Sequence, residues 1–246
     1  MEQIGLFAFI VFAVLTFLLP FSRKAALSRS FTGWMVDLVS LGIHFFILPV
    51  LQIYIVFSLL NMCLYEIKGS FSVGIGDSFF LYLILDYGWY WNHRFFHAET
   101  PFWYLHSTHH RPAKLDFFIT ARNSLVSHFF MVYFWGIGLI VFLLKDASFF
   151  LGFVTFGMLI NFWGHTSFSF KLNGYADRLL SYIFIMPRDH HWHHSREVSN
   201  CNFGTVFSIW DRLHNSLYRP GKLPDRYGED SKETVWNQLI WPFQNK

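Results

Sequence analysis

The chain is organised around residues 93–110, HRFFHAETPFWYLHSTHH, which include five histidines. A second cluster, HHWHH, occupies residues 190–194, and His165 lies between the two clusters. Ten of the 13 histidines therefore fall in these segments. Imidazole is a common ligand for iron, zinc, copper and nickel. The clusters thus predict a metal site.

The spacing within the clusters supports this interpretation. Residues four apart lie on one face of a helix, so His93 and His97 can point at one site, and so can His106 and His110. The same spacing relates His190 to His194. A single pair of this kind is weak evidence. The pattern H-x2-H-H, however, occurs twice in a largely hydrophobic chain. Burial of an imidazole in apolar surroundings costs free energy unless its ring nitrogens are hydrogen-bonded or bind a metal. These histidines are numerous enough for two metal ions.

The composition is that of a membrane protein. The 246 residues are 53% hydrophobic and 14% charged, whereas soluble domains carry about 25% charged residues. The net charge of +3 is modest and the basic residues are scattered, so no nucleic-acid partner is indicated. Cys63 and Cys201 form no C-x-x-C motif, which predicts neither a disulfide framework nor a thiolate metal site.

We expect about five transmembrane helices, because about 20 apolar residues span a bilayer. The first covers residues 4–21; Glu2 and the lack of a small-residue cleavage motif disfavour a signal peptide. The second covers about 38–60, tilted and kinked at Pro49, with 31–37 along the interface. A third helix ends with His93 and His97, and the last two cover 125–144 and 147–164. No crossing is expected after His165.

Charge predicts the orientation. If residues 22–30 are cytoplasmic, so are 93–124 and everything after 164, and that side carries 17 Lys and Arg against two, Lys68 and Lys145, on the other. This satisfies the positive-inside rule. The predicted fold is an all-α integral membrane protein, multi-pass in a bacterial inner membrane or the endoplasmic reticulum. A cytoplasmic histidine-rich metal-binding helical region caps the spans, so a pocket between the helices would deliver a lipid tail to the metals.

Two polar residues are candidates for a supporting role in catalysis. Asp86, Tyr90, His93 and His97 share one helical stripe, and metal-bound histidines usually donate their second N–H to a carboxylate or carbonyl. Asp86 is therefore expected to orient His93, directly or through Tyr90; the alternative is a polar residue that lines a water-filled crevice. Asn161 precedes His165 by one turn and could hold a metal-bound water or a ring nitrogen, or make an ordinary interhelical hydrogen bond.

The remaining histidines are expected outside the site. His191 is surplus to the spacing that His190 sets, although a frame that uses His191 with His194 stays open. His44, His128 and His214 stand alone, and His128 is the best candidate among them because it lies at the cytoplasmic end of a span.

Missing motifs exclude other chemistry. The chain has no Glu-x-x-His pair of soluble di-iron bundles and no H-E-x-x-H of zinc proteases. It has no nucleotide-binding fingerprint, so the electrons for any redox reaction at the metal site must come from an external donor protein or reductant.

Two other interpretations of the predicted metal site stay open. A non-catalytic or transport-type metal-binding membrane protein would hold its ions near the bilayer midplane. A zinc hydrolase on the same histidines would work without O2.

Five motifs together carry a family resemblance: HRFFH (93–97), HSTHH (106–110), PRDHHWHHS (187–195), NFG (202–204) and WDRL (210–213). In order, spacing and flanks they resemble the fatty acid hydroxylase/sterol desaturase superfamily, integral membrane enzymes with a histidine-rich di-iron centre. The resemblance covers roughly residues 77–219. It implies that the metal ligands are His93, His97, His106, His109, His110, His190, His193 and His194, with His165 as a further family histidine.

The resemblance also implies two iron ions, O2 as co-substrate and a lipid C–H bond as target. The lipid would be a fatty acyl, sterol or alkylglycerol lipid, hydroxylated or desaturated. The domains would then be N-terminal transmembrane helices (1–76), a fatty acid hydroxylase-like di-iron catalytic domain (77–219) and a tail (220–246). The chain departs from the family pattern at residues 214–216 (His-Asn-Ser for an aromatic and Gly-Thr) and at 122–124, where many members have His-Pro-x-Glu.

The tail is predicted to end in a helix on the cytoplasmic leaflet. Asp230 with Glu233 fits an N-cap pattern, and Val235, Leu239 and Phe243 share one apolar face. We expect this helix to cover the predicted metal site.

Overall fold

The computed structural model describes residues 2–166, 174–228 and 233–240, and in these parts of the chain it contains helices but no strands. The α-helices are α1 (Glu2–Leu18), α2 (Pro20–Leu27), α3 (Phe31–Gly42), α4 (Leu48–Gln52), α5 (Ser58–Leu64), α6 (Ile75–Ala98), α7 (Thr100–His110), α8 (Leu125–His128), α9 (Val132–Leu143), α10 (Ser148–Gly164), α11 (Gly174–Ile183), α12 (Pro187–His193), α13 (Ile209–Leu213) and α14 (Val235–Leu239). The prediction of an all-α fold is confirmed.

The longest helix runs without interruption from Phe31 to Ile67. Two π-helical segments, η1 (Ile43–Ile47) and η2 (Ile53–Phe57), join α3, α4 and α5, and a 3₁₀ turn, η3 (Tyr65–Ile67), ends it. Pro49 lies at the start of α4, directly after η1, where the wider π turn accommodates a residue that lacks an N–H. Residues 31–37 are the first turns of this same helix, capped by Ser30, rather than a separate interfacial segment.

Membrane-crossing length is shown for one helix. Among the described residues, Phe31–Ile67 is the one helix long and apolar enough to cross a bilayer, and Phe7–Leu18, Val132–Leu143 and Ser148–Gly164 are apolar but shorter. The predicted span 125–144 is divided into α8 and α9, because the chain turns at residues 129–131. Five crossings therefore stay a prediction.

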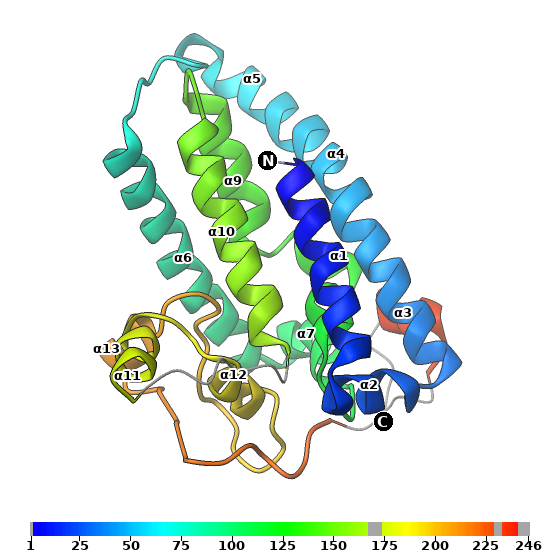
Figure 1. Ribbon diagram of the computed structural model, residues 1–246. Helices are drawn as coiled ribbons and strands as arrows, with labels where there is room; N and C mark the ends of the chain where they lie inside the picture. The colour runs from blue at the N-terminus through cyan, green and yellow to red at the C-terminus, as the bar shows by residue number, and fades with distance from the viewer. Residues whose placement is uncertain (1, 167–173, 229–232, 241–246) are drawn as a thin grey trace.

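The long helices lie alongside one another, and α7 and α12, which carry most of the clustered histidines, lie together at one end (Figure 1). Helix α6 packs against α7, α9 and α10. The α6–α10 contact requires glycine at position 157, because a Cβ there would overlap the hydroxyl of Tyr82. A separate apolar core, built on Phe117, Phe118 and Phe162, joins the segment η4 (Phe117–Ala121) to α10 and the N-terminal helices.

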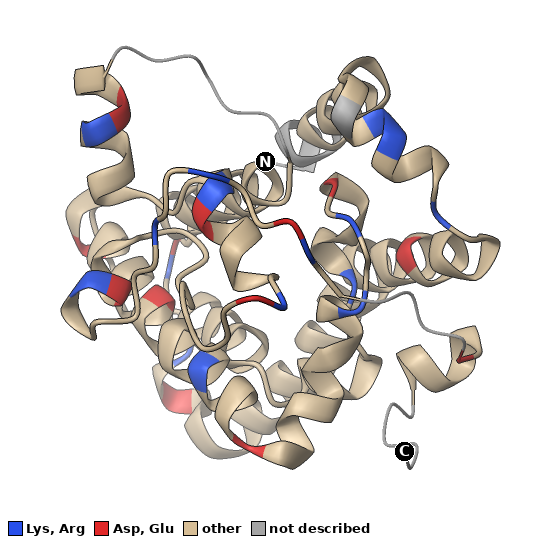
Figure 2. Cartoon of the chain, turned by 90° about the horizontal axis from the view of Figure 1, so that it is seen from below, with Lys and Arg blue, Asp and Glu red and all other residues tan. Residues whose placement is uncertain are grey.

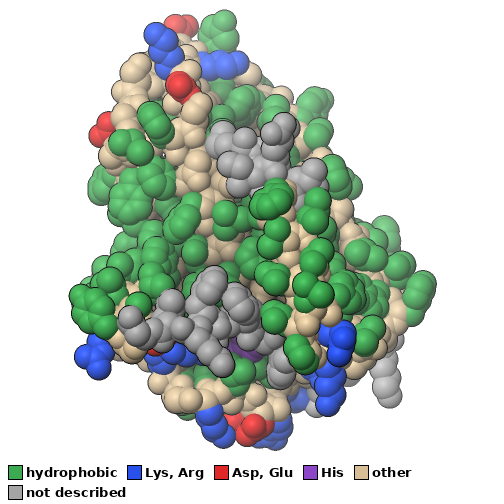
Figure 3. All heavy atoms as spheres, viewed as in Figure 1, with side chains coloured by type: hydrophobic (Ala, Val, Ile, Leu, Met, Phe, Trp, Pro, Cys, Tyr) green, Lys and Arg blue, Asp and Glu red, His purple; other side chains and the backbone are tan. Residues whose placement is uncertain are grey.

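The opposite end of the bundle holds the connections that contain Lys68 and Lys145. They are joined by backbone hydrogen bonds, from Gly69 to Phe142 (3.0 Å) and from Lys145 to Phe71 (2.9 Å). Between the two ends, hydrophobic side chains cover most of the visible surface (Figure 3). On the long helix Phe46 is 77% exposed and Met62 82% exposed. The end that carries the histidines has basic and acidic residues on its loops (Figure 2).

The tail folds back onto α7. Gln238 accepts a hydrogen bond from the Thr108 hydroxyl through its carbonyl (2.9 Å), and a Cβ at Gly228 would overlap the carbonyl of His110. Thr234 caps α14 by accepting from the Asn237 N–H, and Leu239 is buried. Asp230 and Phe243, which were expected to cap and extend this helix, lie outside the described residues. The tail thus contacts α7, the helix that carries the second histidine motif. That the tail covers the metal site stays a prediction.

Candidate metal centre

The structure gathers nine histidines into two groups. In each group the ligand nitrogens lie within 4.8 Å of one another. Group 1 contains five rings and group 2 contains four; every predicted ligand belongs to one or the other. The members of group 1 are His93, His97, His106, His110 and His193, and those of group 2 are His109, His165, His190 and His194.

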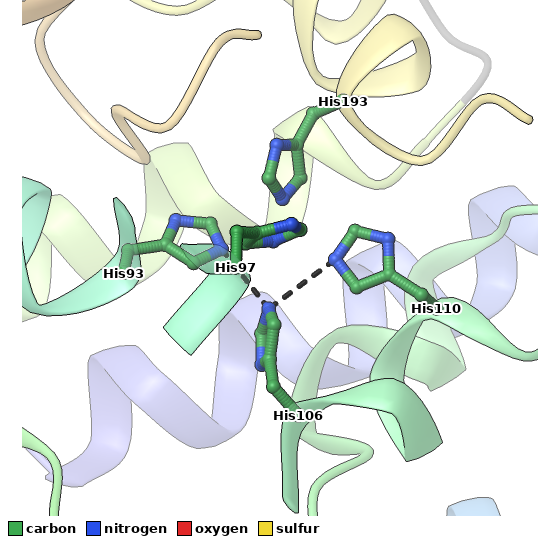
Figure 4. A group of neighbouring side chains, drawn as sticks. All are labelled: His93, His97, His106, His110 and His193. Carbon is green, nitrogen blue, oxygen red and sulfur yellow. Dashed lines mark hydrogen bonds between the residues drawn. The ribbon is translucent and has the colours of Figure 1, made fainter. Parts of the chain in front are cut away.

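In group 1 the rings point at a common centre (Figure 4). The Nε2 atom of His106 lies 3.0 Å from Nε2 of His93 and 3.2 Å from Nε2 of His110. The Nε2 atoms of His97 and His193 are buried without a hydrogen-bond partner. Converging nitrogens that lack donors are costly unless something binds them. A metal ion fits this arrangement.

Group 2 is built in the same way and lies beside group 1. The Nε2 atom of His165 is 3.0 Å from that of His190 and 3.3 Å from that of His109. The rings of His110 (group 1) and His194 (group 2) stack with their centroids 4.3 Å apart. Helix α7 serves both groups because consecutive residues such as His109 and His110 point about 100° apart around a helix. The two groups therefore fit a pair of neighbouring metal ions.

Backbone carbonyls orient the rings. The Nδ1–H groups donate to the carbonyls of four residues: His93 to Phe203 (2.7 Å), His109 to Arg122 (3.1 Å), His165 to Asn161 (2.9 Å) and His193 to Cys201 (2.9 Å). A carbonyl can only accept, so the proton is fixed on Nδ1 and the lone pair on Nε2 faces the centre.

Burial keeps these rings neutral. Loss of water holds the pKa of His106, His109 and His110 well below the usual 6.5, and the neighbouring imidazoles lower it further. The same causes lower the pKa of His190 and His194. Neutral imidazole is the form that binds metals. Among the described residues neither group includes a carboxylate or a thiolate, so each offers a metal neutral nitrogen ligands alone.

Asp86 does not orient His93, contrary to expectation. Its carboxylate accepts hydrogen bonds from the hydroxyl of Tyr133 (3.1 Å) and from the indole of Trp210 (2.7 Å). Seven residues of helix separate Asp86 from His93 by about 10 Å along the axis, which is too far for direct contact. Tyr90, the proposed intermediary, bonds to Ser216 (2.8 Å) instead.

Asn161 does hold a ring nitrogen, that of His165, but through its backbone carbonyl. Histidine 191 points away from both groups, as the spacing predicted. Its Nδ1 lies 2.7 Å from the hydroxyl of Tyr227 and its Nε2 lies 3.1 Å from the carbonyl of Thr166. His44, His128 and His214 also lie outside the groups.

The sequence analysis did not identify the loop 201–204 as part of the site. The loop 201–204 supplies the carbonyls that orient His93 and His193, and Asp211 holds this loop in place. The Asp211 carboxylate accepts from the N–H groups of Phe203 and Gly204, both at 2.8 Å, and from the hydroxyl of Ser216 (2.7 Å). The NFG and WDRL motifs therefore form one support for the histidines. Their presence in the family pattern was the available signal.

A cavity of about 280 Å³ lies among α6, α9, α10 and the long helix. Its wall is largely apolar and includes Trp89, His128, Asn161 and Phe162. Two of these residues also touch the histidine groups: Trp89 stacks on His93 with ring centroids 5.6 Å apart, and Asn161 holds His165. The cavity therefore extends from the interior of the bundle to the residues around the candidate metal centre.

Comparison with known proteins identifies related sequences. The sequence model of one family, fatty acid hydroxylase, matches residues 78–216, more than half of the chain. Alkylglycerol monooxygenase of Xenopus tropicalis is 28% identical over 150 residues, which are 60% of this chain and 31% of that protein. Ornithine lipid hydroxylase OlsE of Rhizobium tropici is 29% identical over 148 residues, 56% of this chain and 40% of that protein.

Alkylglycerol monooxygenase of Danio rerio is 30% identical over 138 residues, 55% of this chain and 29% of that protein. The chain thus spans well under half of the length of the curated relatives that it matches. No solved structure matches it significantly.

Proposed function

Because the chain belongs to the fatty acid hydroxylase family, we propose that it is a membrane-bound oxidoreductase that uses two iron ions and O2 to hydroxylate a lipid. The observation that carries the proposal is the pair of adjacent histidine groups, each made of neutral nitrogen ligands that are buried or, at His97 and His110, half-buried. Imidazole suits iron as well as zinc, copper and nickel, and iron is the metal that the family resemblance implies. When bound, two reduced irons would supply the electrons that activate O2 for attack on an unactivated C–H bond.

The chain's own residues would bind the lipid and exclude water. The apolar cavity reaches the residues around group 1 and group 2, so a lipid tail inside it would lie close to the metals. A dry entrance protects a strong oxidant from side reactions. A lipid substrate is supported by relatives named alkylglycerol monooxygenase and ornithine lipid hydroxylase. Hydroxylation is the preferred reaction, and desaturation is the variant that the same histidine motifs would allow.

A membrane location is supported by the long apolar helix and by the exposed hydrophobic surface between the two ends of the bundle (Figure 3). We infer that the histidine end faces the cytoplasm, because Lys68 and Lys145 lie at the opposite end and the other 17 basic residues belong to segments assigned to the histidine side. An external protein or reductant would deliver electrons from that side.

The proposal predicts two irons per chain and transfer of one oxygen atom from O2 to a lipid. Lipids of cells with and without the protein, grown under ¹⁸O2, would be compared by mass spectrometry, and metal would be measured on purified protein. His97→Ala should abolish labelling. His214→Gln should keep it, because His214 lies outside both groups. One metal per chain after full reconstitution, or no labelled lipid, would contradict the proposal.

A further inference from the structure

His106 of group 1 lacks a backbone partner for its second ring nitrogen. Its Nε2 atom faces the centre of the group, 3.0 Å from Nε2 of His93 and 3.2 Å from Nε2 of His110. An imidazole that binds a metal through Nε2 carries its proton on Nδ1, so Nδ1 of His106 must act as a donor. This Nδ1 atom is buried and, unlike its counterparts in His93 and His193, contacts no backbone carbonyl. A buried donor needs an acceptor.

Asn123 offers the matching acceptor. Its side-chain oxygen Oδ1 is also buried and has no hydrogen-bond donor from any other group. The preceding residue, Arg122, accepts from Nδ1 of His109 through its carbonyl (3.1 Å). His106 and His109 are three residues apart on one face of α7, so a segment that bonds to His109 lies beside His106 as well. The unpaired donor and the unpaired acceptor are therefore neighbours.

The effect of Asn123 on the His106 ring supports this pairing. Burial lowers the pKa of His106 most, and neighbouring imidazoles lower it further. A hydrogen-bonding interaction with the side chain of Asn123 acts in the opposite direction and raises the pKa. Such an interaction raises the pKa of an imidazole when it favours the N–H group. The amide therefore faces the ring with its oxygen, which accepts, rather than with its NH2 group, which donates.

We propose that Asn123 is a positioning residue of the metal centre: its side-chain oxygen accepts a hydrogen bond from Nδ1–H of His106 and so directs the Nε2 lone pair at the metal of group 1. Residues 122 and 123 then support one ligand of each group, His109 through a backbone carbonyl and His106 through a side chain. Asn123 also lines the cavity, so this contact forms part of the boundary between the cavity and the metal centre. The inference rests on metal binding by group 1, which is part of the proposed function.

The test compares two substitutions in the full chain, purified in detergent and loaded with ⁵⁷Fe(II) without O2. Leucine has a similar branched shape but no acceptor, so Asn123→Leu should weaken the binding of one of the two irons about 10- to 100-fold, measured by competition with a chelator. Aspartate has the shape of asparagine and, when ionised, can only accept. Asn123→Asp should therefore bind both irons at least as tightly as the native protein.

Mössbauer spectroscopy of the same samples separates positioning from a merely structural role. A charged acceptor makes the His106 ring a stronger electron donor to its metal. Asn123→Asp should therefore shift the quadrupole doublet of one iron and leave that of the other iron unchanged.

Asn61→Leu and Asn61→Asp are the matched controls. Asn61 also has a buried Oδ1 without a partner, but it belongs to α5, which lies at the end of the bundle opposite α7 (Figure 1). Both changes should leave the iron affinities and the Mössbauer spectrum as they are in the native protein.

A folded Asn123→Leu protein that binds both irons as tightly as the native protein would overturn the proposal. Weaker iron binding by Asn123→Asp, or an unchanged spectrum, would overturn it as well, and this variant decides the question if Asn123→Leu does not fold. Failure of the proposed function would appear elsewhere, in the native protein, as absent iron or absent ¹⁸O transfer. Iron affinities that follow the prediction without ¹⁸O transfer would support the role of Asn123 while rejecting oxidation.

Discussion

At the scale of single residues, Asp211 should be as important for the candidate metal centre as a ligand. Its two carboxylate oxygens accept from the N–H groups of Phe203 and Gly204. An amide would turn an NH2 group toward one of these donors. We therefore expect Asp211→Asn to lower the free energy of unfolding by about 1–3 kcal/mol and to deplete the metal held by group 1, because the carbonyls that orient His93 and His193 belong to this loop.

Thermal unfolding and metal analysis of the purified variant test this prediction. The matched control is Asp225→Asn, since Asp225 pairs with Lys222 on the surface, where both side chains are more than half exposed. Loss of such a pair should change stability by about 0.5 kcal/mol or less. A stable Asp211→Asn protein that retains both metals would show that the loop does not hold the rings.

The sequence predicted which histidines lie together but not what supports them. Nine histidines could be assigned to the candidate site because their spacing and the family pattern depend on side chains. The groups that orient them are backbone carbonyls, as at Phe203 and Arg122. Any residue has such a carbonyl, so no residue type reveals it. Asp86 illustrates the opposite error, since a carboxylate on the right helical face was too far along the axis to reach His93.

At the scale of helices, a buried ion network joins α3 to the segment before α8. Asp37 pairs with Arg29 (2.9 Å) and with Arg122 (3.0 Å), and all three side chains are at most 5% exposed. The carbonyl of Arg122 in turn accepts from His109. Asp37→Asn would leave two buried guanidinium groups undercompensated, so we expect a loss of about 3–5 kcal/mol and weaker metal binding by group 2.

Comparison with Asp177→Asn provides the control, because Asp177 pairs with Arg188 at a site where both are about one-third exposed. That change should cost about 1 kcal/mol or less. Melting curves in detergent, with the metal content of each sample, compare the two variants. Equal effects would show that the buried network has no special role.

Helix prediction succeeded where apolar runs are long and failed at their ends. The positions of α1, α6 and α10 agree with the predicted segments, because hydrophobic runs of that length have few alternatives to a helix. The break between α8 and α9 was missed, since residues 125–144 are largely apolar and the turn itself, at residues 129–131, consists of Phe, Phe and Met. Likewise, the two π-helical segments on either side of α4 were not predicted, and the kink expected at Pro49 stays a prediction.

At the scale of the whole molecule, the agreement between charge and histidine placement was predictable because both depend on which segments share an end. The segments with Lys68 and Lys145 are hydrogen-bonded neighbours at one end, and α7 and α12 lie at the other (Figure 1). The cavity was predictable only as a pocket between helices. The residues of its wall, from α6, α9, α10 and the long helix, come together through tertiary packing that no local pattern encodes.

Metal should stabilise one end of the molecule more than the other. The two groups join α6, α7, α12 and the end of α10, and a ligand that binds only the folded state adds about 2.7 kcal/mol when present at 100 times its Kd. We expect chelation to lower the melting temperature and to increase hydrogen exchange in α7 and α12, while the central turns of α9, which supply no ligand, stay protected. Iron should reverse both effects. In a His97→Ala, His165→Ala double variant, chelator should change little, because one ligand is missing from each group. A uniform rise in exchange over the whole bundle, or none, would mean that metal binding is not what holds α7 and α12 in place.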